Sequence, residues 1–211
     1  MTTTEKLAAI LAAVQVDPGH RGLGPLFRAC PDDFAAACES LARAEEPRVA
    51  ISTGFYIPTA KPPAFETDGP LGALFLLQAL QACAIPATIL AEQQILFLIQ
   101  SLEDLPREGP RSTVSSSDRY SHLIAIERSG PARDGRHYTM RGIDNTEYHD
   151  NGQLYAILED RNCQTIGIGD GGNEIGMGKL PHAIITEAIP NGDRIHCHVA
   201  TEYLIVAGVS N

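Results

Sequence analysis

The chain has no tryptophan, few aromatic residues and fewer basic than acidic side chains. Lys and Arg together number 16 against 26 Asp and Glu, so the formal net charge is −10 at pH 7. A nucleic-acid partner needs a basic surface to meet its phosphates. The charge balance therefore argues against nucleic-acid binding.

Long apolar runs and cysteine pairs are also missing. No stretch of the sequence reaches the roughly 20 apolar residues that a membrane-spanning helix needs. The N-terminus, MTTTEKLAAILAAVQ, lacks the basic start and cleavage pattern of a secretory signal. The five cysteines are scattered and form no CxxC pair, which is typical of a reducing compartment. We therefore expect a cytoplasmic protein without a membrane partner, and the composition leaves a homo-oligomer open.

What the sequence does contain is an alternation of helical and strand-like segments. At 211 residues with 44% hydrophobic content, it suits one domain, residues 1–211, with an N-terminal helical segment at 1–45. The alternation predicts an α/β fold of three layers, with a mostly parallel sheet and helices on both faces. Residues 17–25 are predicted to be a loop, and residues 104–119 are predicted to be a loop or a lid. The predicted helices cover residues 4–15, 32–44, 68–83, 93–102 and 153–162, and the predicted strands cover 48–54, 86–90, 122–127, 165–168, 194–199 and 203–206.

The most informative stretch is QTIGIGDGGNEIGMG, residues 164–178. Glycine at this density costs backbone entropy, which indicates a backbone that must turn tightly or approach something closely. A strand that runs into such a loop places it at the carboxyl edge of the sheet, where open α/β sheets bind ligands. We therefore expect Gly169, Gly171 and Gly172 to lie against a ligand.

The polar residues of this loop allow two interpretations. Asp170, Asn173 and Glu174 are the kind of oxygen-bearing groups that hold a hard cation, and Mg²⁺ bound by Asp170 and Glu174 is one hypothesis. The other is that Asp170 and Asn173 form Asx turns that stabilise the loop. The loop also matches G-x-G-x-x-G, but glycines interrupt the helix that this dinucleotide motif needs.

A second candidate turn precedes the most hydrophobic helix. Asp68 is a plausible N-cap, and Glu66 is free to transfer protons if burial raises its pKa. Lys61 either holds a carboxylate or is solvated. A strand, a polar loop and a helix N-terminus in this order form a geometry that collects anions.

Arginines and histidines supply two further hypotheses. Arg128, Arg133, Arg136 and Arg141 lie on one loop system, and we expect one or two of them to hold a carboxylate. His196 and His198 would share one face of the predicted strand 194–199 and resemble a zinc pair. No third ligand lies nearby in the sequence, which argues against zinc.

Three segments carry a resemblance to a known family. Residues 53–73, 122–142 and 165–178, with the closing block 201–211, resemble the C-terminal domain of D-glutamate cyclase. The resemblance covers about residues 48–211 and implies a carbon–oxygen hydro-lyase that interconverts D-glutamate and 5-oxo-D-proline with loss of water. It matches only the second of the family's two domains and stops short of a tryptophan–glycine block, which implies a truncated or short member. Animal members are mitochondrial, so the mitochondrial matrix is an alternative location.

The resemblance leaves three functions open: a lyase, a non-catalytic module that binds a small carboxylate or phosphate, and a nucleotide-binding domain. For the lyase, we expect Glu66 or Glu174 to act as base and acid, with Asp170 holding a cation or assisting. Backbone N–H groups of residues 169–172 would polarise the substrate carboxyl, and Arg141 or Arg128 would hold the α-carboxylate. All of this requires the turns at 66–70 and 169–174 to face each other across one cleft. The expected substrate-binding residues are Thr53, Lys61, Asp68, Gly69, Arg128, Arg141, Gly169, Gly171, Gly172 and Asn173.

Overall fold

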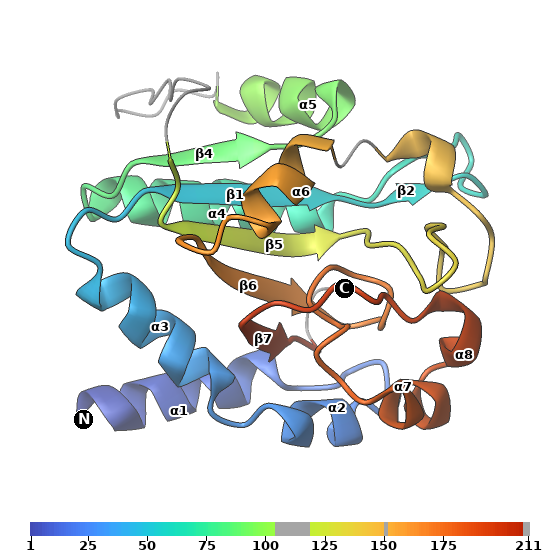
Figure 1. The fold of residues 1–211 in the computed structure, drawn as a ribbon, viewed down its shortest axis with the longest axis horizontal. Coiled ribbons are helices and arrows are strands. Elements are labelled where there is room, and N and C mark those ends of the chain that lie inside the picture. The colour runs from blue at the N-terminus through green and yellow to red at the C-terminus, as the bar shows by residue number, and fades with distance from the viewer. Residues whose placement is uncertain (104–118, 150–151, 209–211) are drawn as a thin grey trace.

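A computed structural model describes residues 1–103, 119–149 and 152–208 of the chain. Five parallel strands form one sheet in the order β4-β1-β5-β6-β7 (Figure 1). A separate antiparallel pair, β2-β3, forms a hairpin directly after β1. The strands are β1 (Val49–Gly54), β2 (Tyr56–Ile57), β3 (Ala64–Phe65), β4 (Ala87–Leu90), β5 (His122–Arg128), β6 (Gln164–Gly169) and β7 (Tyr203–Val206).

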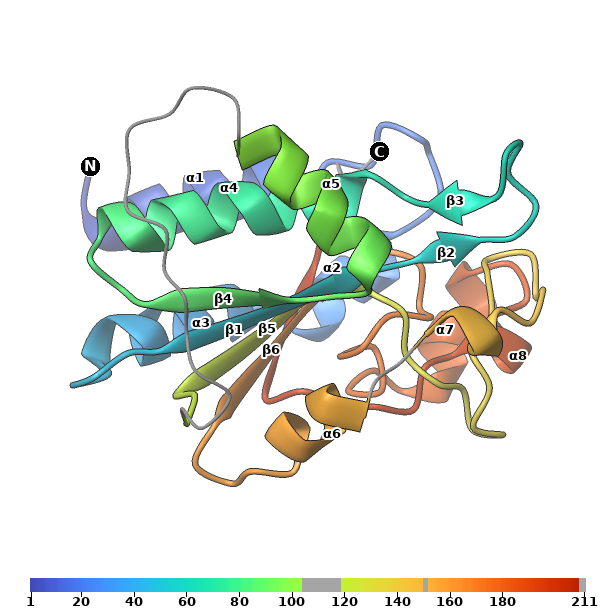
Figure 2. The same ribbon diagram turned by 90° about the horizontal axis from the view of Figure 1, so that it is seen from above.

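Helices cover both faces of the sheet, which confirms the predicted three-layer α/β fold. Figure 2 shows α4 and α5 on one side of the strands and α6 on the other. Among the described residues, no helix is both long enough and apolar enough to span a membrane. The helices are α1 (Thr3–Val14), α2 (Gly24–Ala29), α3 (Asp33–Arg43), α4 (Asp68–Ala82), α5 (Gln93–Glu103), the 3₁₀ turn η1 (Thr146–Tyr148), α6 (Gly152–Leu158), α7 (His182–Ala188) and α8 (Gly192–Ile195).

The central strands are buried on both faces because each face packs against a helix. Every residue of β1 and β5 is buried. On one face, Ile51 and Ile124 belong to the same apolar cluster as Leu77 of α4. On the other face, Leu123 packs in a cluster with Leu154 of α6. Continuous apolar runs are what a parallel sheet covered on both faces requires.

The strand order places a topological switch between β1 and β5. From β1 the chain crosses through α4 to β4 on one side, and it then returns to place β5 on the other side of β1. In open α/β sheets, ligands bind beyond the carboxyl ends of the strands at such a point. The fold therefore directs attention to the segments that follow β1, β5 and β6.

The main error in the sequence prediction lies at residues 194–199. The predicted strand is wrong: α8 ends at Ile195, and Cys197 and Ala200 join their neighbours only through isolated bridges. The chain turns there because Asn191, with φ of 60°, starts a short helix rather than an extended segment. Two short helices, α2 and α7, and the β2-β3 hairpin were not predicted. The predicted loop or lid at 104–119 lies outside the described residues except for its last residue.

Candidate functional site

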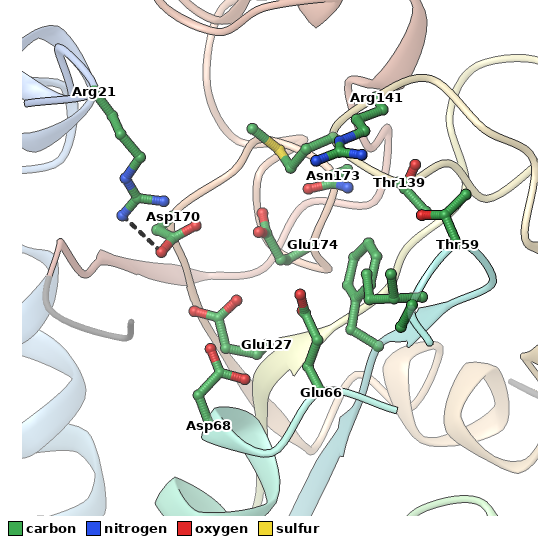
Figure 3. A pocket seen from close by; sticks show the side chains of 14 residues that line it. Arg21, Thr59, Glu66, Asp68, Glu127, Thr139, Arg141, Asp170, Asn173 and Glu174 are labelled. Carbon is green, nitrogen blue, oxygen red and sulfur yellow. Dashed lines mark hydrogen bonds and ion pairs between the residues drawn. The ribbon is translucent and has the colours of Figure 1, made fainter. Parts of the chain in front are cut away.

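A cavity of about 350 Å³ lies beyond the carboxyl ends of β1, β5 and β6. One wall comes from the β2-β3 hairpin and the turn before α4, and another comes from residues 139–141 (Figure 3). The glycine-rich loop after β6 supplies the remaining acidic side chains. The lining residues are Arg21, Phe55, Ile57, Thr59, Ala60, Glu66, Asp68, Glu127, Thr139, Met140, Arg141, Asp170, Asn173 and Glu174.

The two turns singled out in the sequence meet at this cavity. Glu66 and Asp68 enter it from the first turn, and Asp170, Asn173 and Glu174 enter it from the second. Figure 3 shows the carboxyl group of Glu66 directed toward Glu174. The shared cleft that the functional argument required is therefore present.

Glycines make this meeting possible by letting protein segments approach each other. A Cβ atom on Gly69 would lie 2.5 Å from Oγ1 of Thr53 and 3.0 Å from Cβ of Glu127, so the first turn of α4 fits against the strand ends only with glycine. A Cβ atom on Gly169 would lie 2.9 Å from Cβ of Glu174. Neither these two glycines nor Gly171 and Gly172 are among the residues that line the cavity. Their close neighbours are protein groups, which is a different reason for glycine from the ligand contact that we expected.

Glu174 is buried, and one of its two carboxylate oxygens is hydrogen-bonded within the glycine-rich loop. Its Oε1 accepts a hydrogen bond from the backbone N–H of Gly171 at 2.8 Å, whereas its Oε2 has no partner among the described residues. Burial, followed by the nearby charge of Asp170, raises the pKa of Glu174 to about 7. Because Glu174 occupies the Gly171 N–H, that amide is not available to polarise a substrate carboxyl, contrary to the expectation for this turn.

Glu127 is the main residue that the sequence analysis did not assign to the site. It lies near the end of β5 with φ of 44°, a backbone conformation that a residue with a side chain rarely adopts. Its side chain is buried, and its Oε1 has no partner among the described residues. Burial, together with the charges of Glu174 and Asp170, raises its pKa well above the usual value. An acid at the carboxyl end of a central strand, next to the other candidate turns, was the signal that could have identified it.

Arg21 is a second residue that the sequence could not assign. It lies in the loop between α1 and α2, and its guanidinium donates to Asp170 Oδ2 at 2.8 Å. The backbone N–H of Arg21 is itself held by the carboxylate of Asp17 at 3.0 Å. The N-terminal segment thus contributes a cation to a cavity built from the centre of the sheet.

Two acids at the start of α4, Glu66 and Asp68, also line the cavity. Glu66 is exposed, but the neighbouring protein atoms partly remove its carboxyl group from water. This desolvation raises its pKa to about 7, and the charges of Asp68 and Asp170 add to the rise. Asp68 is half-buried, and burial raises its pKa as well. Asp68 is the first residue of α4 rather than its N-cap, which is Thr67, so the predicted capping role is wrong.

Three residues expected to bind substrate lie away from the cavity. Arg128 is buried, and its Nη1 donates to Glu92 Oε2 at 2.7 Å and to the carbonyl of Thr53 at 2.9 Å. Its guanidinium therefore links the end of β1 to the segment after β4, and it does not line the cavity. Thr53 is buried beneath the first turn of α4, and Lys61 is exposed on the hairpin loop outside the cavity lining.

Of the four loop arginines, Arg141 is the one that lines the cavity. Figure 3 shows it above Asn173, which itself donates to the carbonyl of Tyr138 at 2.7 Å. The strand face predicted to be shared by His196 and His198 is wrong, because the structure has no strand at these residues. Instead, His196 Nδ1 lies 2.9 Å from Nδ1 of His182, and the two rings stack.

The electrostatics of the cavity favour positively charged groups. Five carboxyl groups line it, against the guanidinium groups of Arg21 and Arg141. Ligand oxygens of Glu127, Asp170 and Glu174 all lie within 4.8 Å of one another. Such an arrangement attracts an ammonium group or a metal cation, and it repels a phosphate unless a cation accompanies it.

Comparison with known proteins shows the family of the chain. The sequence profile described as "D-glutamate cyclase-like, C-terminal" matches residues 10–211. The chain belongs to the D-glutamate cyclase-like family. It is also 32% identical to the human protein named "D-glutamate cyclase, mitochondrial", in an alignment that covers 100% of this chain and 38% of the human protein. The matched region contains every residue of the cavity in this D-glutamate cyclase-like chain, Arg21 included.

Proposed function

We propose that the chain binds D-glutamate, or an amino acid very similar to it, and interconverts it with 5-oxo-D-proline by loss or gain of water. The observation that carries the proposal is a single cavity in which Glu66 faces buried carboxyl groups while Arg141 lies at the opposite wall. The family and the name of the human relative support the choice of substrate. The chain spans 38% of that relative's length.

The cavity suits a small amino acid with charges of both signs. Its volume of about 350 Å³ lies at the small end of ligand pockets. The planar guanidinium of Arg141 can hold the α-carboxylate through paired hydrogen bonds. The ammonium group would then point toward the acidic wall, within reach of Glu66.

The reaction needs a group that moves protons from nitrogen to oxygen. The amine nitrogen attacks the carbon of the side-chain carboxyl, so a C–N bond forms and a C–O bond breaks. Two protons leave nitrogen and both end on the departing oxygen, which leaves as water, with no net proton exchanged with solvent. A carboxyl group with a pKa near the working pH is suited to carrying them, and the pKa of Glu66 is about 7.

The second candidate function is a non-catalytic module that binds a small carboxylate. It follows from the same cavity, because binding needs only Arg141 and the acidic wall. A phosphate or nucleotide ligand is disfavoured, since five carboxyl groups line the cavity. For location, we propose the cytoplasm, with the mitochondrial matrix as the alternative suggested by the human relative's name. Subcellular fractionation would distinguish the two, and recovery in a membrane fraction would contradict both.

The proposal is tested by following D-glutamate and L-glutamate with the full chain by proton NMR. We expect 5-oxoproline to form from D-glutamate, and Glu66→Gln to lower kcat/KM by at least about a hundredfold, as loss of a general base usually does. Glu159→Gln is the matched control, because Glu159 is exposed and precedes the opposite end of β6. Ligand-induced thermal stabilisation without turnover would support the binding module, and neither binding nor turnover would refute the proposal.

A further inference from the structure

Three carboxyl groups from two separate strand ends converge at one wall of the cavity. Glu127 comes from β5, and Asp170 and Glu174 come from the loop after β6. At least one oxygen of each lies within 4.8 Å of an oxygen of the other two. Each of the three residues is more than nine-tenths buried.

Unpartnered oxygens in this cluster point to a bound ligand. Oε1 of Glu127 and Oε2 of Glu174 are buried and accept no hydrogen bond from the described residues. Oδ1 of Asn173, which is fully buried and borders the same cavity, also lacks a partner there. Buried acceptors without a donor are rare in native proteins, and each one calls for an explanation. Since all three atoms are acceptors, the missing partner carries positive charge or donates protons.

We propose that Glu127, Asp170 and Glu174 bind one divalent cation of the Mg²⁺ or Mn²⁺ class. Oxygen ligands are what hard divalent cations prefer in proteins, and carboxylates are the strongest of these. In an octahedron with bonds of about 2.1 Å, neighbouring ligands lie about 3.0 Å apart and opposite ligands about 4.2 Å apart. A cluster spread over no more than 4.8 Å reaches that geometry through shifts of less than about 1 Å per oxygen.

The open side of the cluster supplies the remaining coordination positions. All three residues line the cavity, so water or a ligand oxygen can reach a cation held there. The carbonyl oxygen of the Asn173 side chain is a further candidate ligand on the same wall. Arg21 does not take the place of the cation, because it contacts Asp170 through Oδ2 from the outer side of the cluster (Figure 3).

The cation site does not depend on the proposed function, since binding can be measured without substrate. If the proposed function also holds, the cation would offset the negative charge that a dicarboxylate substrate meets in this cavity. It would also polarise the carboxyl group under attack. A phosphate- or carboxylate-binding module would gain affinity from the same cation.

The test is titration of the chelator-treated full chain with MnCl₂, followed by electron paramagnetic resonance and calorimetry. We expect one Mn²⁺ per chain, displaced by excess Mg²⁺. Glu127→Gln and Glu174→Gln should each weaken binding by at least about tenfold, because affinity for hard cations follows the number of charged ligands. Asp68→Asn is the matched control: it removes a carboxylate from the same cavity but outside the cluster, and we expect a change of less than about threefold. Absence of binding, or equal weakening by all three variants, would overturn the inference.

A second measurement on the unaltered chain avoids any dependence on how the variants fold. Mn²⁺ is paramagnetic, so it should broaden the amide NMR signals of residues 127–130 and 169–174 before others. Broadening that begins at the exposed acids of the surface, such as Glu39 and Glu159, would overturn the inference. Mn²⁺ binding without D-glutamate turnover would refute the proposed function alone. Turnover that persists in chelator would support the proposed function and contradict a role for the cation in it.

Discussion

The guanidinium of Arg21 and the carboxylate of Asp170 lie 2.8 Å apart, although 149 residues separate them in the sequence. The pair is partly shielded from solvent, with 28% of the Arg21 side chain and 9% of the Asp170 side chain exposed. It fastens the loop between α1 and α2 to the glycine-rich loop after β6. The N-terminal segment is thus joined to the cavity by a side chain that borders it.

We predict that Arg21→Gln destabilises the chain by about 1–2 kcal/mol. The change leaves the mostly buried Asp170 without this positive partner, and such pairs cost more to break than exposed ones. The free energy of unfolding in urea measures the effect. Arg43→Gln is the control, because Arg43 pairs with Glu39 on the surface with 78% and 57% of the side chains exposed. If Arg21→Gln lowers the free energy of unfolding no more than Arg43→Gln does, the Arg21–Asp170 pair contributes nothing to stability.

A second prediction concerns the buried pair of Glu92 and Arg128 at the strand ends. Burial alone would raise the pKa of Glu92, but His149 and Arg128 lower it to about 2. His149 Nδ1 lies 3.6 Å from Glu92, beyond hydrogen-bond range, so we attribute the lowering to Arg128 at 2.7 Å. Glu92→Gln removes the carboxylate to which Arg128 donates, and it should cost about 3 kcal/mol at neutral pH.

The pH dependence of that loss follows from the sign of the shift. The folded-state pKa lies below the unfolded-state value of 4.5, so the stabilisation by Glu92 is complete above about pH 4.5 and is lost as the pH falls toward 2. The difference in unfolding free energy between the unaltered chain and Glu92→Gln should therefore shrink across that window. Glu39→Gln, on the exposed pair, should show a small difference throughout. A Glu92→Gln deficit that stays constant down to pH 2 would contradict the assigned pairing.

The sheet could be predicted from the sequence, and the local shape of the site could be predicted only in part. Apolar runs such as residues 122–127 identify buried strands without any tertiary information. Residues 194–199 look equally strand-like, but their conformation depends on the turn at Asn191 and on packing against other loops. Two-residue strands such as β2 carry too short a pattern to be recognised.

The candidate site shows the same division between local and long-range information. Glu66, Asp170 and Glu174 stand out because they sit in loops after strands, which local pattern reveals. Arg21 could not be found, since nothing near it in the sequence indicates a contact 149 residues away. Arg128 was expected to bind substrate because the sequence does not show whether its guanidinium points toward the cavity or away from it. Its direction depends on Glu92, which follows a different strand and accepts a hydrogen bond from Arg128.

A third prediction uses the close packing of Gly169 against Glu174. In Gly169→Ala, the new Cβ would meet Cβ, Cγ and Cδ of Glu174 at 2.9–3.1 Å, so that side chain must move. We expect Mn²⁺ affinity and any turnover to fall at least about tenfold, since loss of a charged ligand weakens a hard-cation site. Gly72→Ala is the control, because its Cβ would make an ordinary contact of 3.6 Å with Ile126, inside α4. That variant should be more stable by about 0.5–1 kcal/mol. Unchanged binding in Gly169→Ala would contradict the role of Glu174.

A fourth prediction is the pH profile of kcat/KM for D-glutamate. The pKa of Glu66 is raised to about 7, so the base is protonated and inactive below that pH. The rate should therefore rise through about pH 7 and level off above it, rather than rising near the ordinary value of 4.5. The rise should be absent from the residual activity of Glu66→Gln and retained in Glu159→Gln. A midpoint near 4.5 in the unaltered chain would exclude Glu66 as the base.

The most direct test of the central claim is isotope exchange in water enriched in heavy oxygen. Each cycle of lactam formation and hydrolysis replaces an oxygen of the D-glutamate side-chain carboxyl with one from water, which mass spectrometry detects even when little 5-oxo-D-proline accumulates. If the acids of the two turns carry the chemistry, the full chain should label D-glutamate, and Glu66→Gln and Glu174→Gln should label it at least about a hundredfold more slowly. Bound D-glutamate that acquires no label, or labelling that both variants leave unchanged, would contradict the account.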